Sequence, residues 1–301
     1  MTEKDEKRLC RLCPRDCRAD RDKKPGCCLM PRRVRIARAA LHYWEEPPIS
    51  GTKGSGTIFF CGCNLRCVYC QNSAISRDGR SAGREVDDEL LAELMFRLRD
   101  EGAHNINLVT PTHYADALMR VLPTVRKTLG IPVVYNCGGY ESVETLRALD
   151  GLVDIYLPDF KYASSYLAER YSGAPDYPEK ARLALAEMYR QVGNVQLDAD
   201  GIMQKGVIVR HLVLPGCRKD SVEVLAAISE TVPVSGVYLS LLRQYTPEYA
   251  PREIKELCRK ITTFEYDFVT REAEKYGFDG FLQEKESANR VFTPDFSEKT
   301  F

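Results

Sequence analysis

The chain has 301 residues and a mass of 34.1 kDa, enough for one large domain or two small ones. Hydrophobic residues make up 44% and charged residues 29%, which excludes a disordered or collagen-like chain. No apolar run reaches the roughly 18 residues that a membrane span needs, and the charged start MTEKDEKRLC lacks the apolar stretch of a secretory signal. We therefore expect a cytoplasmic globular protein with no membrane partner.

Residues 1–55 form a leader rich in cysteine and arginine. The whole chain is neutral, with 43 basic and 43 acidic residues, but residues 1–40 hold thirteen Lys or Arg and six Asp or Glu. A basic segment of this kind can bind nucleic acid. Its arginines alternate with cysteines, however, and lack an aromatic platform for stacking bases, so nucleic acid is not an expected partner.

From residue 56 to residue 245, short apolar runs alternate with segments of helical pattern. The runs have the length and side chains of buried strands, and they cover residues 57–61, 105–109, 132–136, 152–158, 207–213 and 236–242. Helices are predicted at residues 87–98, with Asp87 as N-cap, and at 115–129, 142–149, 178–192 and 220–231. Because parallel strands need crossover connections, this alternation predicts an α/β fold with a parallel sheet, either a barrel or an open doubly wound sheet.

The C-terminal region, residues 246–301, is predicted to hold a helix and a tail. The helix is expected to start after Pro251, since proline suits a first helical turn. Its apolar residues recur at helical spacing and are expected to pack in the core: Ile254, Leu257, Cys258, Ile261, Phe264 and Phe268. Residues 277–301 have the pattern of an irregular tail.

Cysteine is the unusual component, because nine of the twelve cysteines precede residue 71. A disulfide framework suits short secreted chains, whereas the thiols of a cytoplasmic chain stay reduced. Clustered thiols in a reducing compartment are typically metal ligands. The distribution therefore predicts two metal centres, one in the leader and one directly after the first run.

Cys63, Cys67 and Cys70 form a CxxxCxxC motif in the loop that follows the run at 57–61. A zinc site normally takes four ligands, and this loop offers three. An iron–sulfur cube held by three thiolates keeps one iron free for a substrate. S-adenosylmethionine (SAM) binds in this way, through its amino and carboxylate groups.

The stretch 62–70, GCNLRCVYC, resembles the signature of the radical SAM superfamily, including the aromatic Tyr69 before the third cysteine. The resemblance implies a partial (β/α)6 TIM-like barrel, a 4Fe–4S cluster on the three cysteines, and bound SAM near Gly62 and Tyr69. It implies an oxidoreductase that cleaves SAM reductively to a 5′-deoxyadenosyl radical, which abstracts hydrogen from a substrate. A zinc or ferredoxin-like loop is the alternative interpretation.

More narrowly, the chain resembles the activating enzymes of glycyl radical enzymes. Asp159-Phe160-Lys161 is similar to an Asp-x-Lys element of that group, and Arg210 and the LVLPG turn also match. The resemblance implies catalytic roles for Asp159, Lys161 and Arg210. It further implies a glycyl radical enzyme or a peptide as substrate, and an electron donor such as flavodoxin or ferredoxin.

The chain departs from this group after the second run. Typical activases carry a Gly-Gly-Glu-Pro type segment that cups the SAM amino group, and Thr110-Pro111-Thr112-His113 stands there instead. Hydroxyls and carbonyls can accept hydrogen bonds from an ammonium, so Thr110, Thr112 and His113 remain candidate cofactor-binding residues. Asn136 joins them, because the glycines that follow it would let SAM approach the backbone.

The leader cysteines form a second candidate metal site. Cys10, Cys13 and Cys17 lie at short spacing, and Cys27 and Cys28 follow. Four such thiolates can hold zinc or a second 4Fe–4S cluster. By resemblance to the subgroup, whose leader carries a Gly-x-Cys pattern, Cys28 is the expected fourth ligand and Cys27 the alternative.

Two other functions remain open at this point. One is a different radical SAM reaction, such as peptide or RNA modification. The other is a non-catalytic iron–sulfur or zinc protein whose leader binds nucleic acid. A non-catalytic protein would release no 5′-deoxyadenosine from SAM under strong reductant.

Overall fold

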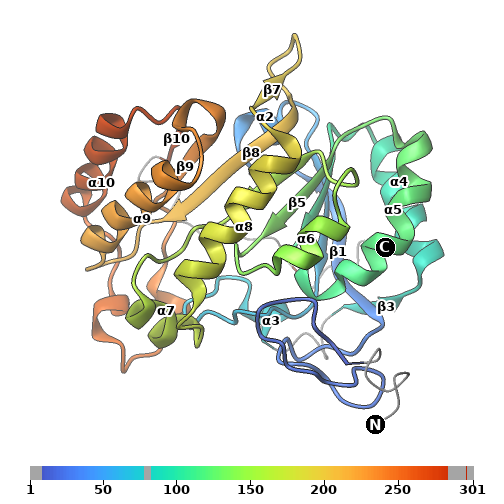
Figure 1. The fold of residues 1–301 in the computed structure, drawn as a ribbon, viewed down its shortest axis with the longest axis horizontal. Helices are drawn as coiled ribbons and strands as arrows, with labels where there is room; N and C mark the ends of the chain where they lie inside the picture. The colour runs from blue at the N-terminus through green and yellow to red at the C-terminus, as the bar shows by residue number, and fades with distance from the viewer. Residues whose placement is uncertain (1–8, 78–82, 284–295, 297–301) are drawn as a thin grey trace.

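The computed structural model describes residues 9–77, 83–283 and 296. Within them, ten strands form one sheet of order β10-β9-β8-β6-β5-β4-β2-β1-β3, and β7 pairs with β8 off this path (Figure 1). The strands are β1 (Val34–His42), β2 (Ser55–Phe60), β3 (Arg84–Val86), β4 (Ile106–Val109), β5 (Val133–Cys137), β6 (Ile155–Pro158), β7 (Gln196–Leu197), β8 (Met203–Leu212), β9 (Tyr238–Leu242) and β10 (Gly280–Leu282).

The neighbouring strands from β2 to β10 in this order are all parallel. Each of the six predicted strands is present, so the predicted parallel α/β sheet is confirmed. The order ends at β3 on one side and β10 on the other. The sheet is therefore a partial barrel, open along one side.

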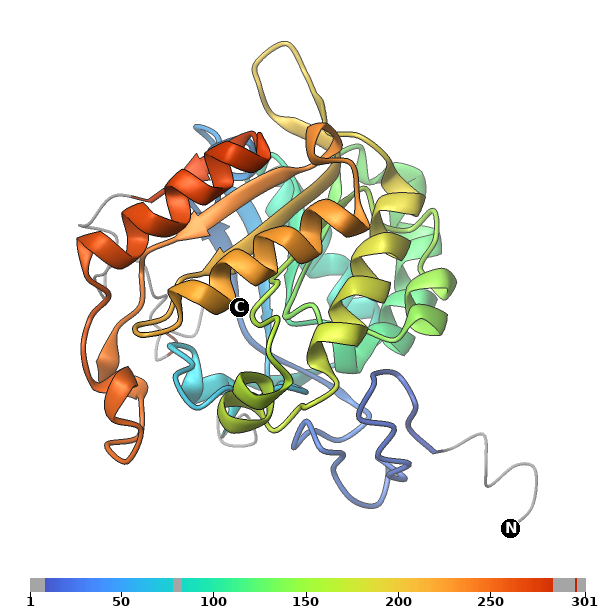
Figure 2. The ribbon, with the colours of Figure 1, turned by 60° about the vertical axis from the view of Figure 1, so that its left-hand side comes forward.

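Helices follow the parallel strands and cover the outer face of the sheet (Figures 1 and 2). They are α4 (Asp88–Asp100), α5 (Ala115–Leu129), α6 (Val143–Ala148), α7 (Ser165–Ser172), α8 (Tyr177–Val192), α9 (Arg218–Thr231) and α10 (Thr263–Tyr276), with one-turn helices α2 (Pro47–Ser50) and α3 (Ser73–Ser76). The predicted cap is confirmed, because the Asp87 carboxylate accepts from the Leu90 N–H at 2.8 Å. Among the described residues, no helix is long and apolar enough to cross a membrane.

The second half of the leader belongs to the sheet. β1 runs antiparallel to β2 and also pairs with β3. In β1 buried residues such as Val34 and Ile36 flank half-exposed Arg35, the pattern of a half-buried strand. Figures 1 and 2 place the residues before β1 at the end of the sheet where α3 and α7 lie, and β7 at the opposite end.

The C-terminal region differs from the prediction. The helix starts at Thr263 and not after Pro251, because Thr262 and Glu265 form a capping box that fixes the first turn. Residues 255–258 form a separate 3-10 turn. Phe264 is 61% exposed, so the predicted stripe is only partly core. β10 adds a strand within the segment predicted to be irregular; residues 284–295 and 297–301 of that tail lie outside the described residues.

Candidate active site

Polar side chains replace apolar ones on the inner face of the sheet where the strands end. Side chains two residues apart in a strand share a face. Val134 and Ile208 lie in a buried apolar cluster on that face, and two residues further along β5 and β8 stand Asn136 and Arg210. Asp159 follows β6 and forms a bridge to Arg210. The strand pattern thus gathers three polar groups at the C-terminal end of the sheet.

These residues line a cavity of about 220 Å³ together with the cysteine loop. It receives residues from β1 and the turn after it, the cysteine loop, the ends of the parallel strands and the segment after β9. The lining includes His42, Trp44, Glu45, Phe59, Cys63, Leu65, Cys67, Tyr69, Cys70, Gln71, Asn72, Val109, Thr110, Asn136, Cys137, Gly138, Asp159, Lys161, Arg210, Leu212, Leu242, Gln244, Tyr245 and Thr246. The three motif cysteines and all three predicted catalytic residues therefore face one space.

The cysteine loop is tied at several points to the rest of the protein. The Asn64 amide donates to the Tyr140 carbonyl at 2.8 Å, and the Val68 N–H donates to the Tyr171 carbonyl at 2.8 Å. The Tyr69 hydroxyl lies 2.6 Å from that of Tyr162. These bonds hold the backbone of the loop so that its thiols face the cavity.

The three thiols lie in surroundings that suit metal ligands. Ser172 Oγ donates to Cys67 Sγ at 3.0 Å, and Ser76 Oγ donates to Cys70 Sγ at 3.4 Å. Burial raises the pKa of Cys63 to about 12, and the Cys67 and Cys70 thiols nearby also raise it. A bound metal supplies the positive charge that lets such thiols ionise.

A charge cluster forms the adjoining wall of the cavity. Asp159 accepts from Lys161 Nζ at 2.5 Å and from Arg210 Nε at 3.1 Å. Burial opposes ionisation of Asp159, but Lys161 and Arg210 lower its pKa below the usual value. Asp159 in turn raises the pKa values of both cations against the effect of burial. The cluster is therefore an ionised network inside the protein.

The turn after β6 orients this cluster. Tyr177 OH donates to the Asp159 carbonyl at 2.9 Å and accepts from the Lys161 N–H at 2.8 Å. Gly139 has φ +77°, and a Cβ on it would lie 2.0 Å from the Asp159 carbonyl oxygen. Asp159 and Lys161 line the cavity, whereas Phe160 is buried against Tyr177. The prediction that the two charged side chains share a side is confirmed.

The sequence carries the profile of a known family. The radical SAM superfamily matches residues 57–227, more than half of the chain. The chain belongs to the radical SAM superfamily. An uncharacterized protein of Methanocaldococcus jannaschii is 31% identical over 278 residues, which cover 90% of this chain and 75% of that protein.

Solved structures of radical SAM enzymes share the fold. A radical SAM methyltransferase from Sphaerobacter thermophilus has a TM-score of 0.51 and 12% identity over 76% of this chain and 66% of its own. Streptococcus suis SuiB, bound to its precursor peptide SuiA, has a TM-score of 0.52 and 11% identity over 79% of this chain and 52% of its own. The chain thus spans less than two thirds of either structure, and at this identity the likeness extends to the fold alone.

Membership in the radical SAM superfamily implies a 4Fe–4S cluster and SAM. The donor set fits such a cluster: three thiols on one short loop face a cavity, and hydroxyl groups donate to two of the sulfurs. In the described part of the chain, no three His, Cys, Asp or Glu side chains form a ready single-ion site. A cube presents a separate iron to each thiolate, so its ligands need not converge as closely as those of one ion.

Glu45 is a cavity residue of this radical SAM protein that sequence reasoning missed. Its carboxylate accepts from Asn107 Nδ2 at 3.0 Å, from Asn136 Nδ2 at 3.3 Å and from Arg210 Nη1 at 3.2 Å. Burial raises its pKa, which Arg210 opposes. Glu45 follows β1, so it reaches the barrel from the leader. The sequence contains a feature that could have marked Glu45 as a candidate site residue, since Glu45 and Glu46 stand in an otherwise apolar stretch before Pro47.

The segment after β4 contributes less than predicted. Thr110 lines the cavity with φ +58°, but Thr112 and His113 do not, because the chain turns inward after this residue. Thr112 Oγ1 donates to buried Glu141 at 2.7 Å, and His113 Nε2 lies 2.7 Å from the Cys61 carbonyl. Their role in binding the cofactor stays a prediction, and in this structure both side chains are buried and bonded within the protein.

Of two further predicted cofactor residues, one lines the cavity and the other does not. Tyr69 lines the cavity, whereas Gly62 is absent from its lining. Gly62 has φ +85°, and a Cβ on it would lie 2.3 Å from Met30 Cγ and 2.8 Å from the Cys28 carbonyl oxygen. Gly62 therefore permits close packing between the cysteine loop and the leader.

The leader cysteines gather near one another. A Cβ on Gly26 would lie 3.3 Å from Cys17 Sγ and 3.5 Å from Cys28 Sγ. Arg21, whose Cδ would lie 3.7 Å from the same Cβ, reaches Cys10 Sγ at 3.9 Å through Nη1. Cys27 is exposed, whereas Cys13 and Cys28 are buried. Cys10, Cys17 and Cys28 thus lie around Arg21 and Gly26, and the choice of Cys28 over Cys27 as a ligand stays a prediction.

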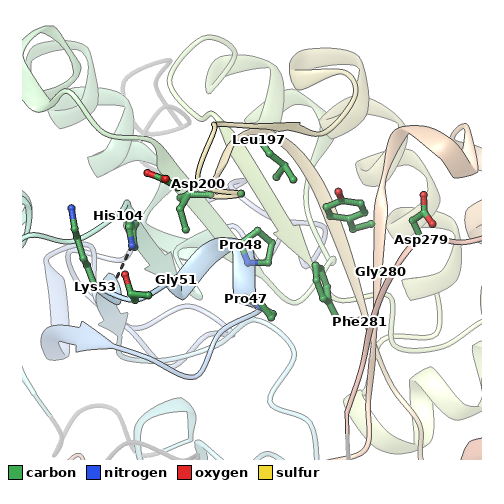
Figure 3. Close-up of a pocket in the computed structure, with 14 residues that line it drawn as sticks. Pro47, Pro48, Gly51, Lys53, His104, Leu197, Asp200, Asp279, Gly280 and Phe281 are labelled. Carbon is green, nitrogen blue, oxygen red and sulfur yellow. Dashed lines mark hydrogen bonds between the residues drawn. The ribbon is translucent and has the colours of Figure 1, made fainter.

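Figure 3 shows a larger cavity, of about 860 Å³. It is lined by residues that precede strands, such as Lys53 before β2 and His104 before β4, and no cysteine faces it. Because radical SAM chemistry requires the thiols, we assign the active site to the smaller cavity.

Proposed function

We propose that this protein cleaves SAM reductively and uses the product to abstract hydrogen from a glycine Cα in a partner polypeptide, as glycyl radical enzyme activases do. The observation that carries the proposal is that Cys63, Cys67 and Cys70 share one cavity with the Asp159–Lys161–Arg210 cluster. A bound 4Fe–4S cluster would supply one electron to split SAM into methionine and a 5′-deoxyadenosyl radical.

The chain's own residues would bind and orient the reactants. The three cysteines would hold the cluster and leave one iron open for the SAM amino and carboxylate groups. Asp159 can accept hydrogen bonds from SAM, and Lys161 can orient a carboxylate or a peptide carbonyl. Held in fixed geometry by each other and by Tyr177, these groups would align the reacting atoms.

A polypeptide substrate is supported by the surface beside the cavity. Trp44 lines the cavity and is 56% exposed, and the preceding Tyr43 is 50% exposed. Exposed aromatic side chains of this kind are typical anchors of protein interfaces. The electron would come from a protein donor such as flavodoxin or ferredoxin, in a reducing cytoplasm.

The leader is proposed to hold a second metal through Cys10, Cys13, Cys17 and Cys28, as zinc or as a second 4Fe–4S cluster. The nearness of Cys17 Sγ and Cys28 Sγ to Gly26 supports the site. Among the described residues the leader thiols form no ready single-ion site, so zinc would require them to move closer together. Metal analysis of anaerobically purified full-length protein should find about eight irons, or about four irons and one zinc, per chain. Four irons without zinc in the fully loaded chain would reject it.

The test of the substrate class uses isotope transfer. Reconstituted protein is incubated with reductant, SAM and glycyl radical enzymes whose glycines carry deuterium on Cα. An activase would give 5′-deoxyadenosine that contains deuterium and a glycyl radical signal in EPR. Deuterium-free 5′-deoxyadenosine with every candidate tested would contradict an activase function. Peptide modification, the alternative, would change the mass of a peptide substrate without a lasting glycyl radical.

A further inference from the structure

Arg15 reaches from the leader to two segments beside the active site. It lies two residues after Cys13 in the sequence. Its guanidinium donates from Nε to the Asn64 carbonyl at 2.8 Å, from Nη2 to the Ser172 carbonyl at 2.7 Å, and from Nη1 to the Gly173 carbonyl. One planar fork thus fixes the cysteine loop against the end of α7.

Both segments held by Arg15 act on the same thiol. Asn64 lies between Cys63 and Cys67 in the loop, so its carbonyl is part of the backbone that places them. Ser172 donates from Oγ to Cys67 Sγ at 3.0 Å. A shift of the guanidinium would therefore move the backbone near Cys67 and the hydrogen bond to its sulfur together.

The other end of Arg15 is bound within the leader cysteines. Arg15 lies in a turn that is closed by the hydrogen bond from the Asp16 N–H to the Cys13 carbonyl at 3.0 Å. The guanidinium also lies 5.3 Å from the centre of the Tyr140 ring, and the Tyr140 carbonyl accepts from the Asn64 amide. Arg15 is thus held by the leader at one end and by the cysteine loop at the other.

A second contact joins the same two regions. The Cys28 carbonyl approaches Gly62 so closely that a Cβ there would lie 2.8 Å from it. Gly62 immediately precedes Cys63 of the loop, and Cys28 is a proposed ligand of the leader site. The contact therefore joins a residue next to one metal site with a ligand of the other. The leader cysteines and the cysteine loop therefore pack as one body.

We infer that Arg15 is a positioning residue that couples the leader cysteine site to the cluster-binding loop, by fixing Asn64 and the Ser172–Cys67 hydrogen bond. The inference rests on the proposed function, because it assumes a cluster on the loop. A sulfur that loses a hydrogen bond changes the electronic properties of the cluster that it binds. Simple capping of α7 by Arg15 would change stability and leave those properties alone.

The test uses the full chain, reconstituted anaerobically with iron and sulfide. The variants are Arg15→Gln, Cys13→Ala and the double change, with Arg18→Gln as control, because Arg18 is 59% exposed and pairs with Asp16. The readout is the EPR signal of the reduced protein that shifts when SAM is added. That signal belongs to the cluster with an open iron, and its midpoint potential and the metal content are measured on the same samples.

Arg15→Gln is expected to alter the SAM-dependent signal and to slow SAM cleavage about tenfold, from the lost hydrogen bonds. Cys13→Ala should alter the signal in the same direction, and the double variant should go no further than Arg15→Gln. Arg18→Gln should match the wild type. An unchanged signal in folded Arg15→Gln, or fully additive effects in the double variant, would overturn the coupling.

Two further outcomes are distinguished by the same samples. If Arg15→Gln does not fold, Arg15→Lys is measured instead, because lysine keeps the positive charge but lacks the forked donors of the guanidinium. A wild-type EPR signal in Arg15→Lys would overturn the inference. If the leader holds no metal while Arg15→Gln still alters the signal, the second metal centre is rejected and the positioning role of Arg15 is supported.

Discussion

The cysteine loop after β2 and the cysteine cluster of the leader both offer thiol ligands, but they lie in different structural surroundings. The loop stands at the ends of parallel strands, and its thiols face a cavity with a charge cluster on the adjoining wall. The leader cysteines lie in a segment without helices, beside the buried Arg21, and none of them lines that cavity. Reaction chemistry therefore belongs to the loop, and the leader is suited to support it.

The largest effect is expected from the loop thiols. Each is one of the three proposed ligands of the cluster, so a single Cys63→Ala, Cys67→Ala or Cys70→Ala change should abolish a stable cluster. The measurement is iron content and visible absorbance after reconstitution. Cys61→Ser is the matched control, because Cys61 lies nearby but not in the cavity lining. A full iron load in Cys67→Ala would contradict the assignment of the cluster to the loop thiols.

The charge cluster should separate turnover from assembly. Asp159→Asn and Lys161→Met remove the ion pair without touching a ligand. Misplaced reactants should lower hydrogen abstraction roughly a hundredfold, while the absorbance of the cluster and the thermal midpoint stay near wild type. Early unfolding of both variants, with failure to load iron, would assign the pair to structure instead.

Glu45 tests whether the leader side of the barrel contributes to the reaction. Glu45→Gln removes the charge that faces Arg210 and should lower turnover roughly tenfold, as the loss of one charge-assisted hydrogen bond does. SAM affinity, turnover per cluster and the thermal midpoint are measured together. A lower midpoint with unchanged turnover would show that Glu45 serves only to hold β1 in place.

The smallest effect on turnover is expected from a leader ligand. Cys28→Ala should remove the second metal and slow SAM cleavage without abolishing it, because the loop keeps all three of its ligands. Metal content and 5′-deoxyadenosine release give the two numbers to compare. Complete loss of SAM cleavage, with the loop cluster still present, would give the leader a direct part in the reaction.

Local patterns predicted much of the fold and the thiol site. The strands alternate with helices, and Cys63, Cys67 and Cys70 stand ten residues or fewer from the end of β2, so both could be predicted from neighbouring residues. The capping box at Thr262 and Glu265 was equally local, and it would have placed the start of α10 correctly.

What the sequence could not provide depends on contacts between distant segments. Glu45 meets Arg210 across 165 positions, and no short motif encodes that contact. Thr112 and His113 follow β4 as Thr110 does, yet they are buried and bond to Glu141 and to the Cys61 carbonyl, whereas Thr110 lines the cavity. Residue order alone does not reveal such a difference.

The central claim is that the cavity beside the cysteine loop cleaves SAM, and release of 5′-deoxyadenosine tests it most directly. Anaerobically reconstituted full-length protein is incubated with SAM and a strong reductant, beside Cys67→Ala as the matched control. We expect 5′-deoxyadenosine and methionine in equal amounts from the wild type and neither from Cys67→Ala. A fully iron-loaded wild type that releases no 5′-deoxyadenosine, or equal release from the variant, would contradict it.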